Sequence, residues 1–269
     1  MGMKTFFFLT LEALSWFFTT NGFAVKLNKL SWMSEQFPPY NWQEAGKPGQ
    51  GIAVEILNEV IKDMGDQLDL NEIKFLPWAR SYSILQTKRQ TALFSMTWTK
   101  ERSKIFNLVG PMIPVVVAII SRADSDFPPD DKNFVKNLSI GVVREDVGDQ
   151  LMLSAGIKDK RPDNYTGNDV RFAEPSNGVD QLIMKLANNR IKGIAYNIDT
   201  AQWVLKKMKA EGKIAKDIKF KAIYTLSESY MTYAFHKDVD PHLIKVFKAS
   251  LEKLRSSGKI EVIRKKYLE

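Results

Sequence analysis

The sequence predicts an α/β fold with two units, each a mixed, mostly parallel sheet flanked by helices. Apolar, β-branched segments alternate with segments of helical period along the whole chain, which is typical of βαβ units. The length of 269 residues fits two units of about 100 residues each better than a single core. Hydrophobic residues make up 44% and charged residues 26% of the chain, the composition of an ordinary globular protein.

Residues 1–24 carry the pattern of a signal peptide. Lys4 supplies a positive charge before an apolar run, and Gly22-Phe23-Ala24 is the small-x-small end that signal peptidase prefers. The apolar run, residues 5–18, is shorter than the ~20 residues of a transmembrane helix. An uncleaved membrane anchor is the alternative interpretation. We therefore expect cleavage near Ala24 and export to the periplasm.

The positions of proline and glycine and the spacing of apolar residues predict the strands and helices in the first part of the chain. The segment 26–34 alternates as a strand does, and Phe37-Pro38-Pro39-Tyr40 ends it because proline cannot donate to a sheet ladder. Apolar residues recur on one helical face over 52–64, and Gly65 ends that helix. The other elements expected here are a strand at 72–76, a helix at 78–87, a strand at 91–97 and a short helix or turn at 99–102.

The rest of the chain alternates in the same way. A charged loop with two prolines at 122–132 separates two strands, and Pro241 stands where the first turn of a helix favours proline. We expect strands at 115–121, 138–143, 190–196, 219–224 and 230–235, and helices at 147–155, 177–189, 200–209, 241–256 and 260–267.

Composition removes several classes of functional site. The chain has no cysteine, which excludes disulfides, thiolate metal ligands and cysteine nucleophiles. Its two histidines, His236 and His242, flank a turn and are interpreted as solvated; a three-histidine metal site cannot form. The net charge of +8 favours anionic partners in general. Export argues against nucleic acid as a partner, and the basic residues within 253–266 are interpreted as a solvated helix face.

Arg102 is the strongest candidate for binding chemistry. It follows the expected strand at 91–97, and ligands collect at the carboxyl ends of strands in α/β sheets. Ser95 and Thr97 share one face of that strand and offer hydroxyl groups. An arginine grips a carboxylate with two parallel hydrogen bonds. The alternative is a surface arginine paired with Glu101 or a nearby aspartate.

Aromatic residues stand at the ends of several expected elements. Such rings can wall an apolar pocket or stack on a planar ligand. Ordinary core packing is the alternative for each of them. The residues are Phe37, Tyr40, Trp42, Trp78 and Trp98.

A helix start after the strand at 138–143 is a second position that attracts anions. Backbone N–H groups at a helix N-terminus favour negative charge, and Arg144 stands just before this one. The segment 141–148 lacks the glycine spacing and the Lys-Ser/Thr pair of a phosphate-binding loop. Asp146 is most simply the N-cap of the helix.

Motifs at well-separated places in the chain occur in a definite order. They are a Phe-Pro-Pro-Tyr turn before a glycine-led helix, Ser-x-Thr-x-Thr-x-x-Arg, a Gly-Val strand, an Arg-led strand that ends in Asn, and a closing helix with Ile-x-x-Lys-Tyr. Their positions are 37–40 with 51–55, 95–102, 140–142, 190–197 and 258–267. Taken together, they resemble the extracellular solute-binding proteins of amino-acid-type ABC transporters, which have the type 2 periplasmic-binding-protein fold.

The resemblance implies a two-lobed, monomeric binding protein that uses no cofactor or metal. Lobe 1 would comprise residues 25–119 plus 228–269, and lobe 2 residues 120–227, with hinges near 119–121 and 226–228. The lobes would close over a small carboxylate-bearing ligand, and an ABC permease or a receptor in the inner membrane would read the closed form.

Roles for single residues follow from the same resemblance. Arg102 would clamp the ligand carboxylate, and the loop 144–147 would close from the second lobe. The expected ligand-binding residues are Phe37, Tyr40, Trp78, Ser95, Met96, Thr97, Arg102, Arg144, Asp146, Val147 and Asn197.

Departures from the family pattern leave the ligand class open. Asn197 stands where the family has the aspartate that binds an amine, and Asp199 could replace it only if the loop were displaced. Val147 stands where the family has threonine. An amino acid and an organic acid without an ammonium group are both consistent with the sequence.

Other functions compete with uptake. The fold family includes periplasmic dehydratases, similar to cyclohexadienyl dehydratase, that act on cyclic carboxylic acids. Such an enzyme needs an acid or base in the cleft. Glu55, Glu145, Asp146 and Asp199 are the candidates, and none of them lies in a second catalytic motif. We therefore expect binding without catalysis. A stand-alone sensor that uses the same closed state is the remaining alternative.

Overall fold

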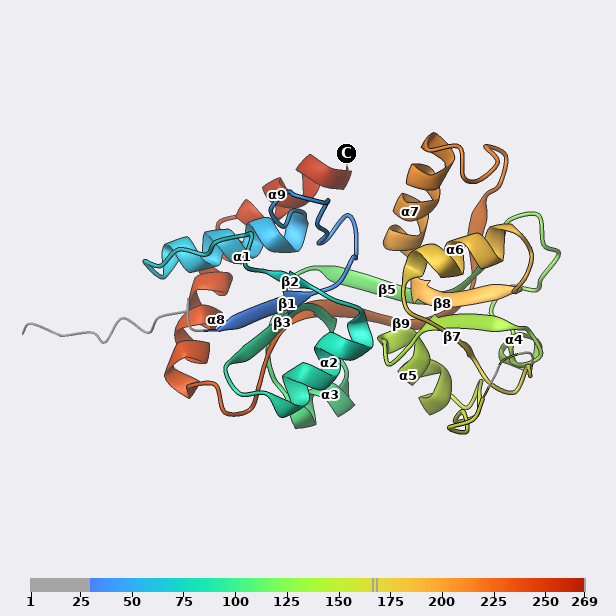
Figure 1. Ribbon diagram of the computed structural model, residues 1–269, viewed down its shortest axis with the longest axis horizontal. Coiled ribbons are helices and arrows are strands. Elements are labelled where there is room, and N and C mark those ends of the chain that lie inside the picture. Colours follow the sequence, from blue (N-terminus) through green and yellow to red (C-terminus); the bar gives the residue numbers. More distant parts are fainter. Residues whose placement is uncertain (1–29, 166, 168, 269) are drawn as a thin grey trace, which may run out of the picture.

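The computed structural model describes residues 30–165, 167 and 169–268. The predicted signal peptide, residues 1–24, lies outside these ranges. Nine strands of the described chain join in one sheet with the order β2-β1-β3-β9-β5-β8-β6-β7, and β4 pairs with β9. Figure 1 shows the result as two lobes joined by two long strands, β5 and β9. The α/β class and the two-lobed architecture predicted from the sequence are confirmed.

Lobe 1 is built on three parallel strands. β1 (Ser31–Ser34) lies between β2 (Lys74–Phe75) and β3 (Thr91–Thr97) and pairs with both in parallel. β3 then pairs antiparallel with β9. The helices of this lobe are α1 (Ile52–Asp63), α2 (Trp78–Thr87), α3 (Lys100–Ile105), α8 (Pro241–Ser256) and α9 (Lys259–Leu268).

Lobe 2 repeats this plan with a second set of parallel strands. β6 (Ile140–Val143) lies between β7 (Glu174–Ser176) and β8 (Gly193–Asn197) and is parallel to both. β8 pairs antiparallel with β5. The helices are α4 (Lys132–Lys136), α5 (Val147–Ser154), α6 (Val179–Ala187) and α7 (Ile198–Ala210).

The two crossing strands are longer than the sequence predicted. β5 spans Pro114–Arg122, and β9 runs without a break over Phe220–Phe235 where two separate strands were expected. β9 stays extended because both of its ends have partners: its first part pairs with β5, and its last part pairs with β3 and β4 (Asn107–Val109).

One short helix was missed because its segment has the composition of a loop. The stretch 122–132 was expected to be a charged loop, yet α4 begins at its end. The Asp131 side chain accepts hydrogen bonds from the backbone N–H groups of Asn133 and Phe134, at 2.9 and 3.0 Å, which caps the helix. Val135, on the inner face of this helix, is fully buried.

The fold brings the carboxyl ends of the parallel strands of the two lobes face to face. β1 and β3 end at Ser34 and Thr97, and β6 and β8 end at Val143 and Asn197. Loops and helix starts after these ends therefore line the boundary between the lobes, where α/β sheets place their ligands. In the part of the chain that the structure describes, no helix is both long enough and apolar enough to cross a bilayer.

Candidate ligand-binding site between the lobes

Arg102 lies completely buried at the boundary between the lobes. α3 starts directly after β3, and its N-cap Thr99 accepts a hydrogen bond from the Arg102 backbone N–H at 3.1 Å. This turn directs the side chain back toward the strand end. There Nη1 donates to the Thr97 carbonyl at 3.1 Å, and Nε donates to Gln150 of lobe 2 at 3.2 Å. With none of its surface exposed, Arg102 is not a surface arginine.

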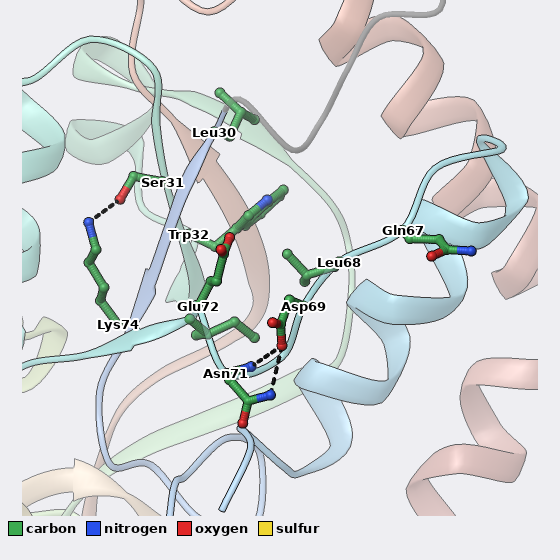
Figure 2. Close-up of a pocket in the computed structure, with 10 residues that line it drawn as sticks. Leu30, Ser31, Trp32, Gln67, Leu68, Asp69, Asn71, Glu72 and Lys74 are labelled. Atoms are coloured by element: carbon green, nitrogen blue, oxygen red, sulfur yellow. Dashed lines mark hydrogen bonds between the residues drawn. The ribbon is translucent and has the colours of Figure 1, made fainter.

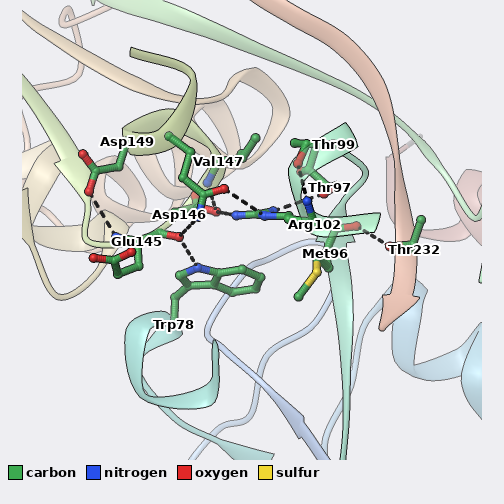
Figure 3. Close-up of polar contacts among 11 residues, drawn as sticks. Trp78, Met96, Thr97, Thr99, Arg102, Glu145, Asp146, Val147, Asp149 and Thr232 are labelled. Atoms are coloured by element: carbon green, nitrogen blue, oxygen red, sulfur yellow. Dashed lines mark hydrogen bonds and ion pairs between the residues drawn. The ribbon is translucent and has the colours of Figure 1, made fainter. Parts of the chain in front are cut away.

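Two neighbouring aromatic rings of α2 lie against the Arg102 guanidinium. Its central carbon lies 5.1 Å from the ring centroid of Trp78 and 5.6 Å from that of Tyr82, within the range of cation–π attraction. Trp78 also reaches across to lobe 2, where its indole Nε1 donates to the Glu145 carbonyl at 2.8 Å (Figure 3). Trp78 therefore both holds Arg102 and bridges the lobes.

Asp146 opposes Arg102 from lobe 2. Its Oδ1 lies 3.9 Å from Nη2 of Arg102 and also accepts a hydrogen bond from the Val147 backbone N–H at 2.6 Å. The carboxylate thus caps α5, as the sequence indicated, and forms an ion pair across the boundary. Burial raises the pKa of Asp146, and Arg102 opposes this rise.

A glycine brings the start of α5 to this position. A Cβ atom on Gly148 would stand 2.1 Å from the Ala195 carbonyl of β8, so only glycine allows the helix to approach this strand so closely.

Glu35, which the sequence analysis did not single out, belongs to the same cluster. It follows β1 directly, and only 8% of its surface is exposed. Burial raises its pKa well above 4.5; Asp146 raises it further, and Arg102 opposes the change. Tyr196 of lobe 2 is 1% exposed, and its hydroxyl has no hydrogen-bond partner among the described residues. Burial raises the pKa of this phenol, and the charges of Glu35 and Asp146 raise it further.

A buried polar network joins the ends of β1 and β3. Ser95 has a φ angle of 62° at a register shift in the pairing with β9, and its hydroxyl donates to Oδ1 of Asn41. The Asn41 amide in turn donates to the Ser34 hydroxyl at 2.7 Å and to the Glu35 carbonyl at 2.8 Å. Ser95 therefore positions the strand ends through Asn41, and the neighbouring Met96 and Thr97 are buried.

Aromatic residues of the Phe-Pro-Pro-Tyr turn also contact lobe 2. The Phe37 ring meets that of Tyr196 edge to face, with 5.7 Å between centroids. The Tyr40 hydroxyl donates to Oδ2 of Asp199 at 2.9 Å. Asn197 caps α7 by accepting a hydrogen bond from the Thr200 backbone N–H at 2.8 Å. Asp199 and the side-chain oxygen of Asn197 are therefore engaged within the protein, whereas the Asn197 amide nitrogen is buried without a hydrogen-bond partner among the described residues.

The cluster combines charges and donors suited to a small charged ligand. Nη2 of Arg102 is buried and has no hydrogen-bond partner among the described residues, which is costly for a guanidinium unless a further acceptor arrives. No three histidine, aspartate or glutamate side chains in the described ranges lie close enough together to hold a metal ion.

Comparison with known families agrees with this geometry. The model of the bacterial extracellular solute-binding proteins, family 3, matches residues 31–269. The chain belongs to this family. A search of curated proteins finds no significant match to this solute-binding protein.

Solved structures share the fold of this solute-binding protein at low sequence identity. A histidine kinase sensor domain similar to periplasmic binding proteins has a TM-score of 0.73 and 17% identity, covering 90% of this chain and 97% of that one. The arginine-, lysine-, histidine-binding protein ArtJ from Geobacillus stearothermophilus has a TM-score of 0.71 and 20% identity, covering 89% and 95%. The P235GK mutant of ArgBP from T. maritima has a TM-score of 0.69 and 20% identity, with the same coverage.

Two cavities of this solute-binding protein are lined by neither Arg102 nor Glu35. Figure 2 shows one of about 570 Å³ around Trp32 and Leu68, near the start of β1 and therefore at the opposite end of that strand from Glu35. Another, of about 790 Å³, is lined by Arg144 and Arg161. It borders the cluster at Glu145 and Gln150, which accept hydrogen bonds from Trp78 and Arg102. Arg144 is exposed and so stands apart from the buried cluster, whereas Val147 is buried.

Proposed function

We propose that this protein captures a small carboxylate-bearing ligand, an amino acid or a related organic acid, between its two lobes. An ABC permease or a receptor in the inner membrane would then read the closed form. The observation that carries the proposal is the buried Nη2 of Arg102, which lacks a hydrogen-bond partner among the described residues and faces lobe 2. An acceptor from a ligand carboxylate satisfies this donor, and the neighbouring rings of Trp78 and Tyr82 help to hold the guanidinium in place.

Closure over a ligand requires a flexible joint, and the strand pairing supports one. Between residues 114 and 116, β5 pairs only with Glu228–Tyr230 of β9, whereas from Val117 onward it also pairs with β8. We place the hinge in this two-stranded stretch. Its β5 side lies a few residues before the 119–121 expected from the sequence. On β9, the stretch 228–230 overlaps the end of the hinge expected at 226–228.

An amino acid is the ligand class that the relatives favour. Proteins of similar structure include an arginine-, lysine-, histidine-binding protein and an ancestral arginine-binding protein bound to glutamine or to arginine. Arginine and glutamine share the α-carboxylate that Arg102 is suited to hold. The exported location, with a signal peptide removed near Ala24, is part of the same proposal.

We propose binding without turnover, because three of the four acids considered for an enzymatic role are already engaged within the protein. Of the acids considered for an enzymatic role, Glu55 bonds to Tyr267 on the α1–α9 side of lobe 1, and Asp199 is held by Tyr40. Asp146 is held by the start of α5 and by Arg102. An acid–base catalyst needs a free acid or base against the substrate. A bound ligand recovered chemically unchanged supports this view, and its conversion to a product contradicts it.

A thermal-shift screen of amino acids, dicarboxylates and aromatic acids tests the function, because a ligand that binds only the folded form raises the melting temperature. We expect Arg102→Ala to abolish any shift and Arg102→Lys to reduce it, since lysine keeps the charge but not the two-pronged geometry. Arg89→Ala is the matched control, because the Arg89 side chain is 80% exposed and pairs with Asp238 at the surface. A ligand that stabilises Arg102→Ala as much as the wild type contradicts the proposal.

A further inference from the structure

We propose that Arg161 is a positioning residue for the site between the lobes. Through the carboxylate of Asp149, it holds the backbone turn at Glu145 in the conformation that lobe 1 contacts. The inference rests on the proposed function and deepens it, because it names a residue behind the site that sets the lobe 2 side of the ligand-binding boundary.

Arg161 and Asp149 form a double hydrogen bond. Arg161 lies between α5 and β7, and its Nη1 and Nη2 donate to Oδ1 and Oδ2 of Asp149 at 2.8 and 2.6 Å. The two side chains are 14% and 4% exposed. Nη1 also donates to the Ala173 carbonyl, next to β7, at 3.2 Å. A forked contact of this kind fixes the plane and the direction of the carboxylate.

The fixed carboxylate in turn holds the backbone at Glu145. Asp149 lies in the first turn of α5, and its Oδ2 accepts a hydrogen bond from the Glu145 backbone N–H at 3.1 Å (Figure 3). An acid in this position that reaches back to the start of its helix is related to the capping box. Glu145 has a φ angle of 62°, a conformation that non-glycine residues keep only with support from their surroundings. The hydrogen bond to Asp149 supplies such support.

The turn at Glu145 is the point where lobe 2 meets the groups around the guanidinium. Its carbonyl accepts hydrogen bonds from Nε1 of Trp78 at 2.8 Å and from Nε2 of Gln150 at 3.0 Å. The side-chain oxygen of Gln150 accepts from Nε of Arg102 at 3.2 Å. The turn therefore contacts Trp78 directly and Arg102 through Gln150, so a change in its conformation reaches both.

Loss of Arg161 removes the partner of a buried charge. A buried carboxylate without its cation is far less stable than a paired one, so Asp149 must turn toward solvent. The Glu145 N–H then loses its acceptor, and the Glu145 carbonyl moves away from Trp78. If the ion pair served only the stability of lobe 2, its loss would lower that stability and leave the contact with Trp78 intact.

Hydrogen exchange at the Trp78 indole N–H tests the assignment without a ligand. The mature protein, residues 25–269, is labelled with nitrogen-15, and Trp78→Phe identifies the signal among the indole resonances. We expect Arg161→Ala to raise the exchange rate of this proton about tenfold, as for the loss of one hydrogen bond. Arg161→Lys should raise it less, since lysine keeps the charge but not the fork. Arg171→Ala is the control, because Arg171 also lies between α5 and β7, is 70% exposed, and pairs with Asp169.

The indole signal of Trp203, in α7, reports whether lobe 2 is folded in each variant. Faster exchange at Trp78 in Arg161→Ala, with the Trp203 signal retained, supports the proposal. Unchanged exchange at Trp78, or the same increase in Arg171→Ala, overturns it. If Arg161→Ala loses the Trp203 signal, Arg161→Lys decides by the same criteria, because it leaves no buried charge unpaired.

The thermal-shift screen separates this inference from the proposed function. Any compound that stabilises the wild type should stabilise Arg161→Ala less, and an equal shift in both proteins overturns the role of Arg161 while leaving the proposed function intact. A screen in which no carboxylate stabilises the wild type contradicts the proposed function, whereas the exchange at Trp78 still shows whether Arg161 holds the turn.

Discussion

The carboxylate of Asp146 faces the guanidinium of Arg102 across the two lobes, with 3.9 Å between Oδ1 and Nη2. The two side chains are 11% and 1% exposed, so this ion pair lies in the interior of the protein. An acid of the chain itself thus occupies one side of the group that we propose binds the ligand carboxylate. The ligand must share the guanidinium with Asp146 or displace it.

This relationship predicts the effect of Asp146→Asn. Asparagine caps a helix as well as aspartate does, so α5 keeps its first hydrogen bond while the competing charge disappears. We expect affinity for the carboxylate ligand to rise by about tenfold, or ~1.4 kcal/mol, in calorimetric titration. Asp146→Ala separates the two roles, because it also removes the cap and costs ~1 kcal/mol of folding stability. Weaker binding by Asp146→Asn would show that Asp146 contacts the ligand directly.

The raised pKa of Glu35 predicts how the stability of the ligand-free protein depends on pH. At pH values below 4.5, Glu35 is protonated in both the folded and the unfolded chain. As pH rises through the raised folded pKa, the unfolded chain loses this proton first, so the free energy of unfolding falls. Asp146, whose pKa is also raised, acts in the same direction.

Urea denaturation of wild type and Glu35→Gln at a series of pH values measures this effect. The wild type should lose stability from about pH 5 upward, and Glu35→Gln should lose less, since Arg102 and Asp146 then face a neutral amide. The variant should be the more stable protein near neutral pH. If the stability of the two proteins changed with pH in the same way, the pKa of Glu35 would not be raised by its surroundings.

The bond between Tyr40 and Asp199 predicts a measurable coupling between the lobes. The Tyr40 hydroxyl donates a hydrogen bond to the Asp199 carboxylate at 2.9 Å. Burial raises the pKa of Tyr40, and the charge of Asp199 raises it further, so the phenol stays protonated. A double-mutant cycle with Tyr40→Phe and Asp199→Asn should give a coupling free energy of about 1 kcal/mol. Additive effects of the two substitutions would mean that the lobes do not hold this contact in solution.

Gly148 predicts a steric test of how lobe 2 presents Asp146. The Cβ of Gly148→Ala would fall 2.1 Å from the Ala195 carbonyl, so α5 must move away from β8. We expect a loss of ~1–3 kcal/mol in stability and weaker ligand binding. Gly178→Ala is the control, because no atom lies within 4 Å of its added Cβ. Equal stability of Gly148→Ala and wild type would contradict the packing described for α5.

The sequence was sufficient to predict those parts of the site that depend on local order. Arg102 follows a buried strand, and the structure places it at that strand's carboxyl end. Asp146 precedes an amphipathic segment, and it caps the resulting helix. Strand ends and helix starts leave local signals in residue type and spacing, so their positions could be read before the fold was known.

The remaining parts depend on how the lobes meet, which spacing does not encode. Glu35 is a single acid after a strand, and only the fold brings it under the influence of Arg102 and Asp146 from distant parts of the chain. Arg144 and Asp146 differ by two positions, yet the first is exposed and the second buried. Glu145 between them has a φ angle of 62°, a backbone turn that few non-glycine residues adopt and that the sequence does not signal.

A crystal structure with a bound amino acid tests the central claim most directly. The account predicts that the ligand lies between the lobes, with its carboxylate oxygens about 3 Å from the guanidinium nitrogens of Arg102. A ligand bound instead in the cavity beside Arg144, with Arg102 and Asp146 still paired and untouched, would contradict it.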